Sequence, residues 1–437
     1  MKNIMLLILS LMLVGCNLCE RPAEGAFVTV RDGKFYVGDE SYNYIGTNLW
    51  YGSILGSVGQ GGNRERLCRE LDDLLALGIT NVRCLVGGEG NRELPDHIVP
   101  NLQPQAGVYN DTLLAGLDFL MQELGRRGMK AVLYLHNAWQ WSGGYGTYLE
   151  WAGEGEAAPA SVWNEYTRHH SKFVRSDSAR ALALRHTQFI VGRTNALTGR
   201  AYRDDPALMA WEVCNEPRPF ARDNATKACY LSWIQEQARA IKQIDPNHLV
   251  TTGSEGLYGS EMDMELYEAV HALQEIDYLC IHIWPFTWGW LGPFVSPNSE
   301  ARLRCPEGML ERGVEVACRE TRRYINEHVQ VARRLGKPIV LEEFGYPRDG
   351  FEISPCTPTT ARDRYYEFVF RQVGDSAVGL AGCNFWAWGG RASVRHPFWQ
   401  RWDDYTGDPA QEEQGLYSVF ATDTTTLAVV RRFAGGE

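Results

Sequence analysis

Two runs of the sequence carry an apolar stretch up to a carboxylate. Residues 211–219, WEVCNEPRP, reach Glu216, and residues 338–347, PIVLEEFGYP, reach Glu343. Pro217 lacks the N–H that a strand would need to continue, so the first strand ends there. Two carboxylates delivered by two strand ends are the minimum equipment for cleaving a glycosidic bond.

Each run alone has a simpler explanation, because Asn, Pro and acidic residues are common in solvated turns. Polar and aromatic residues at the ends of other apolar runs favour a catalytic site instead. They are Arg83, His136, His282 and Trp386. Such residues are not expected where strand ends serve only to attach loops.

The elements that must position these residues alternate along the chain. Strand-like runs rich in Val, Ile, Leu and aromatic residues recur, and several are apolar without alternation, as in strands buried on both faces. They are residues 42–50, 79–85, 130–136, 208–214, 248–253, 278–283, 338–344 and 382–388. The helical patterns between them, such as residues 64–78, 109–128, 226–244 and 314–336, carry apolar residues at three-to-four spacing.

This alternation predicts an α/β fold, a (β/α)8 TIM barrel, whose strands deliver Glu216 and Glu343 to one rim. A doubly wound open sheet is the alternative, but no G-x-G-x-x-G run follows the first strand. We expect an N-terminal β-hairpin at residues 27–37 with an Asp-Gly turn. Long loops after strands 3 and 6, residues 139–153 and 284–308, are expected to line the site.

Regular alternation within a strand allows only one of Glu342 and Glu343 to face the barrel axis, and it does not say which. Glu212 precedes Glu216 by four residues and shares its parity. We interpret Glu212 as a buried, paired structural acid.

The N-terminus predicts export. Lys2 and the apolar run 4–14 form a signal peptide that is too short for a comfortable membrane span. Residues 13–16, LVGC, resemble the lipobox of bacterial lipoproteins, with a plain secretory signal as the alternative. We therefore expect a signal peptide at 1–15, lipidation of Cys16, a tether at 16–25 and a single catalytic domain at 26–437. The expected location is the bacterial cell envelope, lipid-anchored in the outer membrane, on either its periplasmic face or the cell surface.

The composition restricts the classes of partner that the protein is expected to bind. The net charge of −11 argues against a nucleic-acid or anionic-membrane surface, so membrane contact is expected only through the lipid. Ten cysteines remain besides Cys16, and Cys214, Cys280 and Cys383 lie in strand-like runs that favour buried thiols. No cysteine or histidine cluster has metal-ligand spacing, so neither a metal nor a cofactor is expected.

Five motifs together resemble glycoside hydrolase family 5. They are N-V-R, W-E-x-x-N-E-P, H-I-W-P, E-E-F-G and N-F-W-A-W-G-G, in this order across the chain. The longer runs HNAWQWSGGYGTYLEW, YRDDPALMAWEVCNEPRP, TTGSEG, HIWPFTWGW and QGLYSVFATDTTT resemble its endo-β-1,4-mannanase subfamily. The resemblance implies a retaining hydrolase that cleaves β-1,4-mannosidic bonds in mannan, glucomannan or galactomannan by double displacement.

The resemblance also implies roles for single residues. Glu216 matches the acid/base, Glu343 the nucleophile and Asn215 the amide that binds the sugar 2-hydroxyl. Arg83 matches the arginine that keeps the nucleophile ionised. Further substrate contacts are expected from His136, Asn137, His282 and Trp386, and from Trp284, where many relatives carry Tyr.

Several other tryptophans are either sugar platforms or packing residues. We favour platforms for Trp141 and Trp388 and packing for the rest, which are Trp50, Trp139, Trp288, Trp211 and Trp233. Two alternatives to a monomeric mannanase remain at this point. One is a β-1,4-glucanase of the same family, and the other is a non-catalytic glycan-binding barrel at the cell surface.

Overall fold

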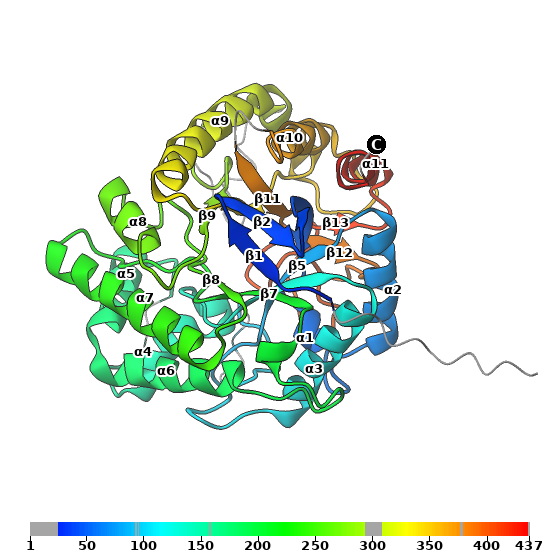
Figure 1. Cartoon of the computed structure of the whole chain (residues 1–437). Helices are drawn as coiled ribbons and strands as arrows, with labels where there is room; N and C mark the ends of the chain where they lie inside the picture. The colour runs from blue at the N-terminus through cyan, green and yellow to red at the C-terminus, as the bar shows by residue number, and fades with distance from the viewer. Residues whose placement is uncertain are drawn as a thin grey trace, which may run out of the picture.

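The computed structural model describes residues 25–91, 94, 96–156, 159–292, 308–375 and 379–435. The expected signal peptide, most of the tether and Cys16 lie outside these ranges. A ring of strands at the centre is surrounded by helices (Figure 1). Among the described residues, no helix combines the length and the apolar character needed to cross a membrane.

Eight parallel strands form the central sheet, in the spatial order β8-β7-β6-β5-β4-β11-β10-β9. The predicted (β/α)8 barrel is confirmed, because each predicted strand range overlaps one of these strands. Their bounds are β4 Tyr44–Asn48, β5 Asn81–Leu85, β6 Lys130–Tyr134, β7 Leu208–Glu212, β8 Leu249–Thr251, β9 Leu279–Ile283, β10 Ile339–Phe344 and β11 Leu380–Phe385.

The ring closes between its two end strands, β8 and β9. Asp277 N donates to Val250 O at 2.8 Å, and Thr251 Oγ1 donates to Tyr278 O at 3.1 Å. Hydrogen bonds therefore connect each of the eight strands to a neighbour on both sides. The carboxyl ends of all eight strands meet at one rim.

Helices cover the outside of the ring (Figure 1). The four helical patterns quoted above correspond to α2 Arg64–Ala76, α3 Asp111–Arg126, α7 Asn224–Ile244 and α9 Met309–Leu335. Asn63, Asn110 and Asp223 cap the first three by accepting hydrogen bonds from first-turn N–H groups. The other helices of the outer layer are α6 Asp177–Val191, α8 Met264–His271, α10 Thr360–Phe370 and α11 Thr424–Ala434.

The predicted hairpin closes one end of the barrel, the end at which the amino ends of the strands lie. It comprises β1 Val28–Arg31 and β2 Lys34–Val37, extended by β3 Glu40–Ser41. Asp32 and Gly33 have φ of 50° and 68°, as a type I′ turn requires. Phe35 packs inside the barrel against Tyr278, with ring centroids 5.3 Å apart, so the hairpin plugs this end.

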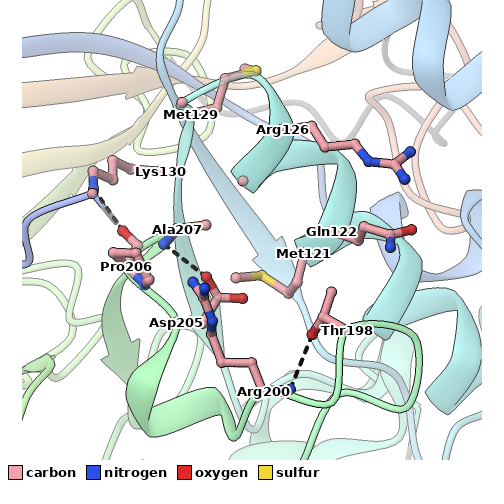
Figure 2. A pocket seen from close by; sticks show the side chains of 13 residues that line it. Met121, Gln122, Arg126, Met129, Lys130, Thr198, Arg200, Asp205, Pro206 and Ala207 are labelled. Carbon is pink, nitrogen blue, oxygen red and sulfur yellow. Dashed lines mark hydrogen bonds between the residues drawn. The ribbon is translucent and has the colours of Figure 1, made fainter. Parts of the chain in front are cut away.

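A pocket of about 650 Å³ lies at this same end of the barrel, beside the amino ends of β6 and β7 (Figure 2). Lys130, the first residue of β6, donates from Nζ to Ala26 O at 3.1 Å and to Pro206 O at 2.6 Å. These bonds tie the start of the described chain to the amino ends of β6 and β7, at the opposite end of the barrel from the rim.

The first of the two long connections differs from the expected loop. The first is largely helical and buried, with the 3₁₀ helix η1 Gln140–Ser142 and the helix α4 Gly144–Trp151, followed by α5 Trp163–His170 and η2 Phe173–Arg175. Most of the second, residues 293–307, lies outside the described ranges. The remaining short elements are α1 Gly52–Leu55, η3 Tyr202–Asp204, η5 Asp349–Phe351, and the paired strands β12 Trp388–Gly390 and β13 Val419–Phe420.

Two further predictions agree with the structure. Cys214, Cys280 and Cys383 are buried free thiols, and Trp211 and Trp233 are fully buried packing residues.

Candidate active site

Arg83 lies at the centre of the rim, on β5, and is fully buried. Its Nε and Nη2 bind the two oxygens of Glu212 at 2.7 and 2.5 Å. Nη1 donates to Glu343 Oε1 at 2.5 Å and to Asn48 Oδ1 at 3.0 Å, and Nη2 also donates to Asn215 Oδ1 at 2.8 Å. A guanidinium has five N–H groups, and all five are used. The interpretation of Glu212 as a buried, paired acid agrees with these contacts.

A β-bulge in β10 brings two adjacent glutamates into the barrel. Leu341 pairs with Ile281 and Glu343 pairs with His282, so Glu342 is the extra residue. Glu343 contacts Arg83, while Glu342 Oε1 accepts from Tyr278 Oη at 3.0 Å inside the barrel. The expectation that only one of the two can face the axis is wrong, because it assumed regular alternation.

Glu216 follows β7 with an unusual backbone. Its φ of 49° lies in the left-handed region, which non-glycine residues rarely adopt. Glu216 N donates to Gly253 O at 2.9 Å, and this holds the turn against β8. A Cβ on Gly253 would lie 1.9 Å from Cys214 O, so only glycine permits this approach. Strained backbone of this kind is common where a side chain must be aimed at a reaction centre.

The carboxyls of Glu216 and Glu343 face each other across His282. His282 Nδ1 lies 2.9 Å from Glu216 Oε1 and 3.3 Å from Glu343 Oε2. One oxygen of each carboxyl and the imidazole nitrogen all lie within 4.8 Å of one another. Burial, followed by the charge of Arg83, lowers the pKa of His282 well below its usual range, so the neutral ring bridges the two acids with Nδ1–H as the donor.

Burial dominates the electrostatics of this pair. It raises the pKa of both carboxyls, against the opposing charge of Arg218 at Glu216 and of Arg83 at Glu343. The charge of Glu216 raises the pKa of Glu343 further. Two buried carboxyls at this separation do not both ionise freely, so they share a proton near neutral pH.

Trp139 contacts Glu216 directly, which the sequence analysis did not predict. Its Nε1 donates to Glu216 Oε2 at 2.5 Å, on the other oxygen from the one that His282 contacts. The guanidinium of Arg218 lies 5.3 Å over the Trp139 ring and binds Glu255 through two hydrogen bonds of 2.5 and 2.6 Å. Trp139 therefore orients Glu216 from the side away from Glu343.

The remaining polar residues named from the sequence lie around this centre. Asn215 Nδ2 donates to Asn137 Oδ1 at 3.1 Å, and Asn137 in turn donates to Ser142 Oγ at 3.0 Å. Asn137 is fully buried, so it supports Asn215 and is not exposed to a substrate. His136 differs more from expectation, because it is buried with Thr187 at 2.8 Å from Nε2 and Tyr148 at 3.2 Å from Nδ1. Both ring nitrogens are occupied, so no contact to a substrate is left.

The tryptophans divide into two groups. Trp284 is half-buried, packs edge-on against Trp386 with centroids 6.0 Å apart, and hydrogen-bonds toward Glu216. Trp141 and Trp388 are 4% and 0% exposed and pack into the core. Neither presents a face to a sugar, so the expectation of two platforms disagrees with the structure. In the sequence, Trp141 and Trp388 have both apolar and polar neighbours. This mixture does not indicate that the two side chains are buried.

Two further residues at the centre were missed. Tyr417 packs edge-on against Trp284, with centroids 5.2 Å apart. Glu412 interacts electrostatically with Glu216, and burial raises its pKa well above the usual range. Both come from the segment after β12, whose sequence lacks strand or helix periodicity. The quoted run QGLYSVFATDTTT was the only signal for Tyr417.

Two groups of His and Glu side chains have donor atoms close enough to consider a cation. One is the Glu216, His282 and Glu343 centre, and the other is Glu89 with His136 and His186. Hydrogen bonds within and around each group account for the approach of its atoms: Glu89 accepts from Tyr148 Oη at 3.2 Å and from Gly144 N at 3.2 Å. Carbohydrate cleavage by two carboxyls needs no metal.

Known proteins share this architecture and sequence. The family profile described as "GH family 5 beta-mannosidase-like" matches residues 25–435. The chain belongs to glycoside hydrolase family 5. It is therefore a glycosidase built on a TIM barrel, as its motifs predicted.

A plant protein and a fungal protein illustrate the similarity of this family 5 enzyme to known relatives. It is 26% identical to mannan endo-1,4-beta-mannosidase 1 of Arabidopsis thaliana over 395 residues, which cover 86% of this chain and 84% of that protein. The glycoside hydrolase family 5 mannosidase from Rhizomucor miehei superposes with a TM-score of 0.81 at 30% identity, covering 94% and 98% of the two chains. The endo-1,4-beta-mannanase from the same fungus, at 22% identity and a TM-score of 0.66, shows the fold alone.

Replacing Arg83 tests how far this family 5 enzyme depends on one cation. We expect Arg83→Lys to lower the free energy of unfolding by about 3–5 kcal/mol, because an ammonium cannot hold Glu212 and Glu343 together and leaves buried charge uncompensated. Urea denaturation measures the change. Arg69→Lys is the matched control: its ion pair with Glu65 is exposed on both sides, and the expected change is within about 0.5 kcal/mol. Equal small losses in both variants would contradict the central role of Arg83.

Proposed function

We propose that this enzyme hydrolyses β-1,4-mannosidic bonds in mannan, glucomannan or galactomannan with retention of configuration. The observation that carries the proposal is the approach of Glu216 and Glu343 oxygens to within 4.8 Å. Retaining glycosidases hold their carboxyls about 5–5.5 Å apart, whereas inverting enzymes need about 6.5–9.5 Å to admit a water molecule.

The proton that the pair shares is assigned to Glu216. Glu343 accepts a hydrogen bond from the charged Arg83 at 2.5 Å, which favours its ionised form. Glu216 accepts from neutral donors, Trp139 and His282. Glu343 is thus the nucleophile and Glu216 the acid.

The reaction then takes two steps. Glu343 attacks the anomeric carbon while Glu216 transfers its proton to the leaving oxygen, which gives a covalent mannosyl-enzyme. Glu216 next removes a proton from water, the water oxygen attacks the same carbon, and Glu343 leaves with the configuration retained. Asn215 uses one N–H on Asn137, and its second N–H is free to bind the sugar 2-hydroxyl.

The choice of mannan is supported by the names of relatives, several of which are mannan endo-1,4-beta-mannosidases. A variant of the Rhizomucor miehei mannosidase was solved in complex with mannosyl-fructose, and that structure superposes with a TM-score of 0.82. The likeness to a mannosidase also supports a second candidate, exo action that releases short units from a chain end.

A product profile tests the proposed reaction. We expect the chain lacking residues 1–19 to release manno-oligosaccharides from linear mannan and galactomannan, with the β-anomer formed first, as NMR would detect. Glu343→Ala and Glu216→Ala should each lower the rate by at least about 10²-fold, because each removes a reacting group.

Other products would change the proposal in defined ways. One short product would favour exo action, cleavage of soluble cellulose alone would favour a β-1,4-glucanase, and no cleavage at all would favour a glycan-binding barrel. An α-anomer as the first product would exclude retention.

Trp139 offers a test of the acid. Its hydrogen bond lowers the pKa of Glu216, so Trp139→Phe should raise that pKa. Glu216 must be protonated for the first step, and the alkaline limb of kcat/KM should therefore move to higher pH. Trp163→Phe is the matched control, since Trp163 stacks on Trp139 with centroids 6.1 Å apart and its nearest rings are Trp139 and Tyr166. A shift of the limb in both variants, or in neither, would contradict the assignment.

We also propose that the enzyme acts as a monomer anchored by lipid at Cys16 in a bacterial outer membrane. The support is residues 4–16 of the sequence alone. Cells that express the full chain should incorporate a labelled fatty acid into it, and Cys16→Ala should abolish the label. Cys356→Ala, which removes an exposed cysteine of the barrel, is the control. An unchanged label in Cys16→Ala would leave a plain secretory signal.

A further inference from the structure

We propose that Glu342 is a positioning residue for Glu343: it stays a neutral acid inside the barrel and so leaves the charge of Arg83 to Glu212 and Glu343. The inference rests on the proposed function, because it takes Glu343 as the nucleophile. It adds a fourth glutamate to the centre, beside Glu212, Glu216 and Glu343, and this one touches neither substrate nor reacting atoms.

The bulge in β10 brings Glu342 into the barrel close to other buried acids. In a regular strand Glu342 and Glu343 would point to opposite faces. Here the extra residue lets both point inward, so two adjacent acids enter a space that already holds Glu212. Three fully or almost fully buried carboxyls therefore surround one guanidinium.

Arg83 has no free N–H group that could donate a hydrogen bond to Glu342. Its five N–H groups are used on Glu212 twice, and once each on Glu343, Asn48 and Asn215. An ionised Glu342 would thus be a buried charge without a direct cationic partner, which is strongly unfavourable.

The groups that face Glu342 from every neighbouring element are mostly neutral at pH 7. They are Tyr44 of β4, Arg83 of β5, Glu212 of β7, Tyr267 of α8, Tyr278 directly before β9, and Cys280 of β9. Arg83 is the single cation among these groups, and Glu212 neutralises it. The balance of charge around Glu342 therefore favours the neutral acid.

The hydrogen bonds agree with a neutral acid. Tyr278 Oη donates to Oε1, whereas Oε2 is buried and makes no regular hydrogen bond to any residue in the described ranges. Burial, and next the charge of Glu212, raises the pKa of Glu342 to about 8. A rise in pH through this value places a second charge beside Arg83, where it competes with Glu343.

The sign of the stability effect follows from linkage. A glutamate in the unfolded chain has a pKa of about 4.3, so between that value and about 8 the folded state keeps a proton that the unfolded state has lost. Stability falls as pH rises through this window, and the loss is complete above the folded pKa. Glu342→Gln mimics the neutral acid and removes this loss.

The experiment compares Glu342→Gln with the wild type as full-length chains. The melting temperature of the variant minus that of the wild type should increase as pH rises from 5 to about 8, as linkage requires. Above that pH the difference should stay constant. The kcat/KM on linear mannan should fall at alkaline pH more in the wild type, so that the ratio of variant to wild type rises by about tenfold between pH 6 and 9 as Glu343 is drawn out of place. Glu212→Gln is the matched control, since it removes the direct partner of Arg83 and should lose activity at every pH.

Tyr278→Phe gives an independent check. It removes the donor to Oε1, and that bond lowers the pKa of Glu342. The onset of the alkaline loss should therefore move to higher pH in this variant.

The two readouts separate the possible failures. Parallel melting curves for wild type and Glu342→Gln at all pH values would mean that Glu342 is already charged, which overturns the inference. A gain in melting temperature without any change in the pH profile of kcat/KM would make Glu342 a purely structural acid and overturn its positioning role. Inactivity of the wild type on every mannan would overturn the proposed function, while melting, which needs no substrate, would still decide the charge state of Glu342.

Discussion

The fixed number of N–H groups on Arg83 constrains the whole catalytic rim. Five donors meet five acceptors drawn from β4, β7, β10 and the turn after β7. Because a guanidinium is planar and rigid, it fixes directions as well as charge. The positions of Glu212, Glu343 and the amide of Asn215 all follow from how the donors of this one group are divided.

Irregular backbone makes that division possible. A regular barrel would turn one of Glu342 and Glu343 outward and would extend β7 past the point where Glu216 must bend. The bulge, the left-handed residue and the close approach at Gly253 each break a rule of local geometry. Departures of this kind gather where function needs a side chain in a place that ideal strands do not supply.

Local patterns explain what the sequence could predict. The strands and the longer helices follow from periodicity, and the hairpin follows from its Asp-Gly turn. Glu216 and the Glu342–Glu343 pair were identifiable because strand ends of a barrel share one rim, whereas the choice of Glu343 over Glu342 came from the family resemblance. The bulge left no trace in residue types, so the inward turn of Glu342 was invisible. Burial of His136, Trp141 and Trp388 depends on tertiary packing, and single residues of these types give no indication of it.

The attachment of the N-terminus has a consequence for orientation. Gly25 and Ala26 lie beside Pro206 and Lys130, at the end of the barrel that the hairpin closes, whereas Glu216 and Glu343 lie at the other end. Residues 16–24, even fully extended, span at most about 30 Å. A barrel held by lipid at Cys16 would thus stand close to its membrane with Glu216 and Glu343 at the far end, where a large polymer can reach them.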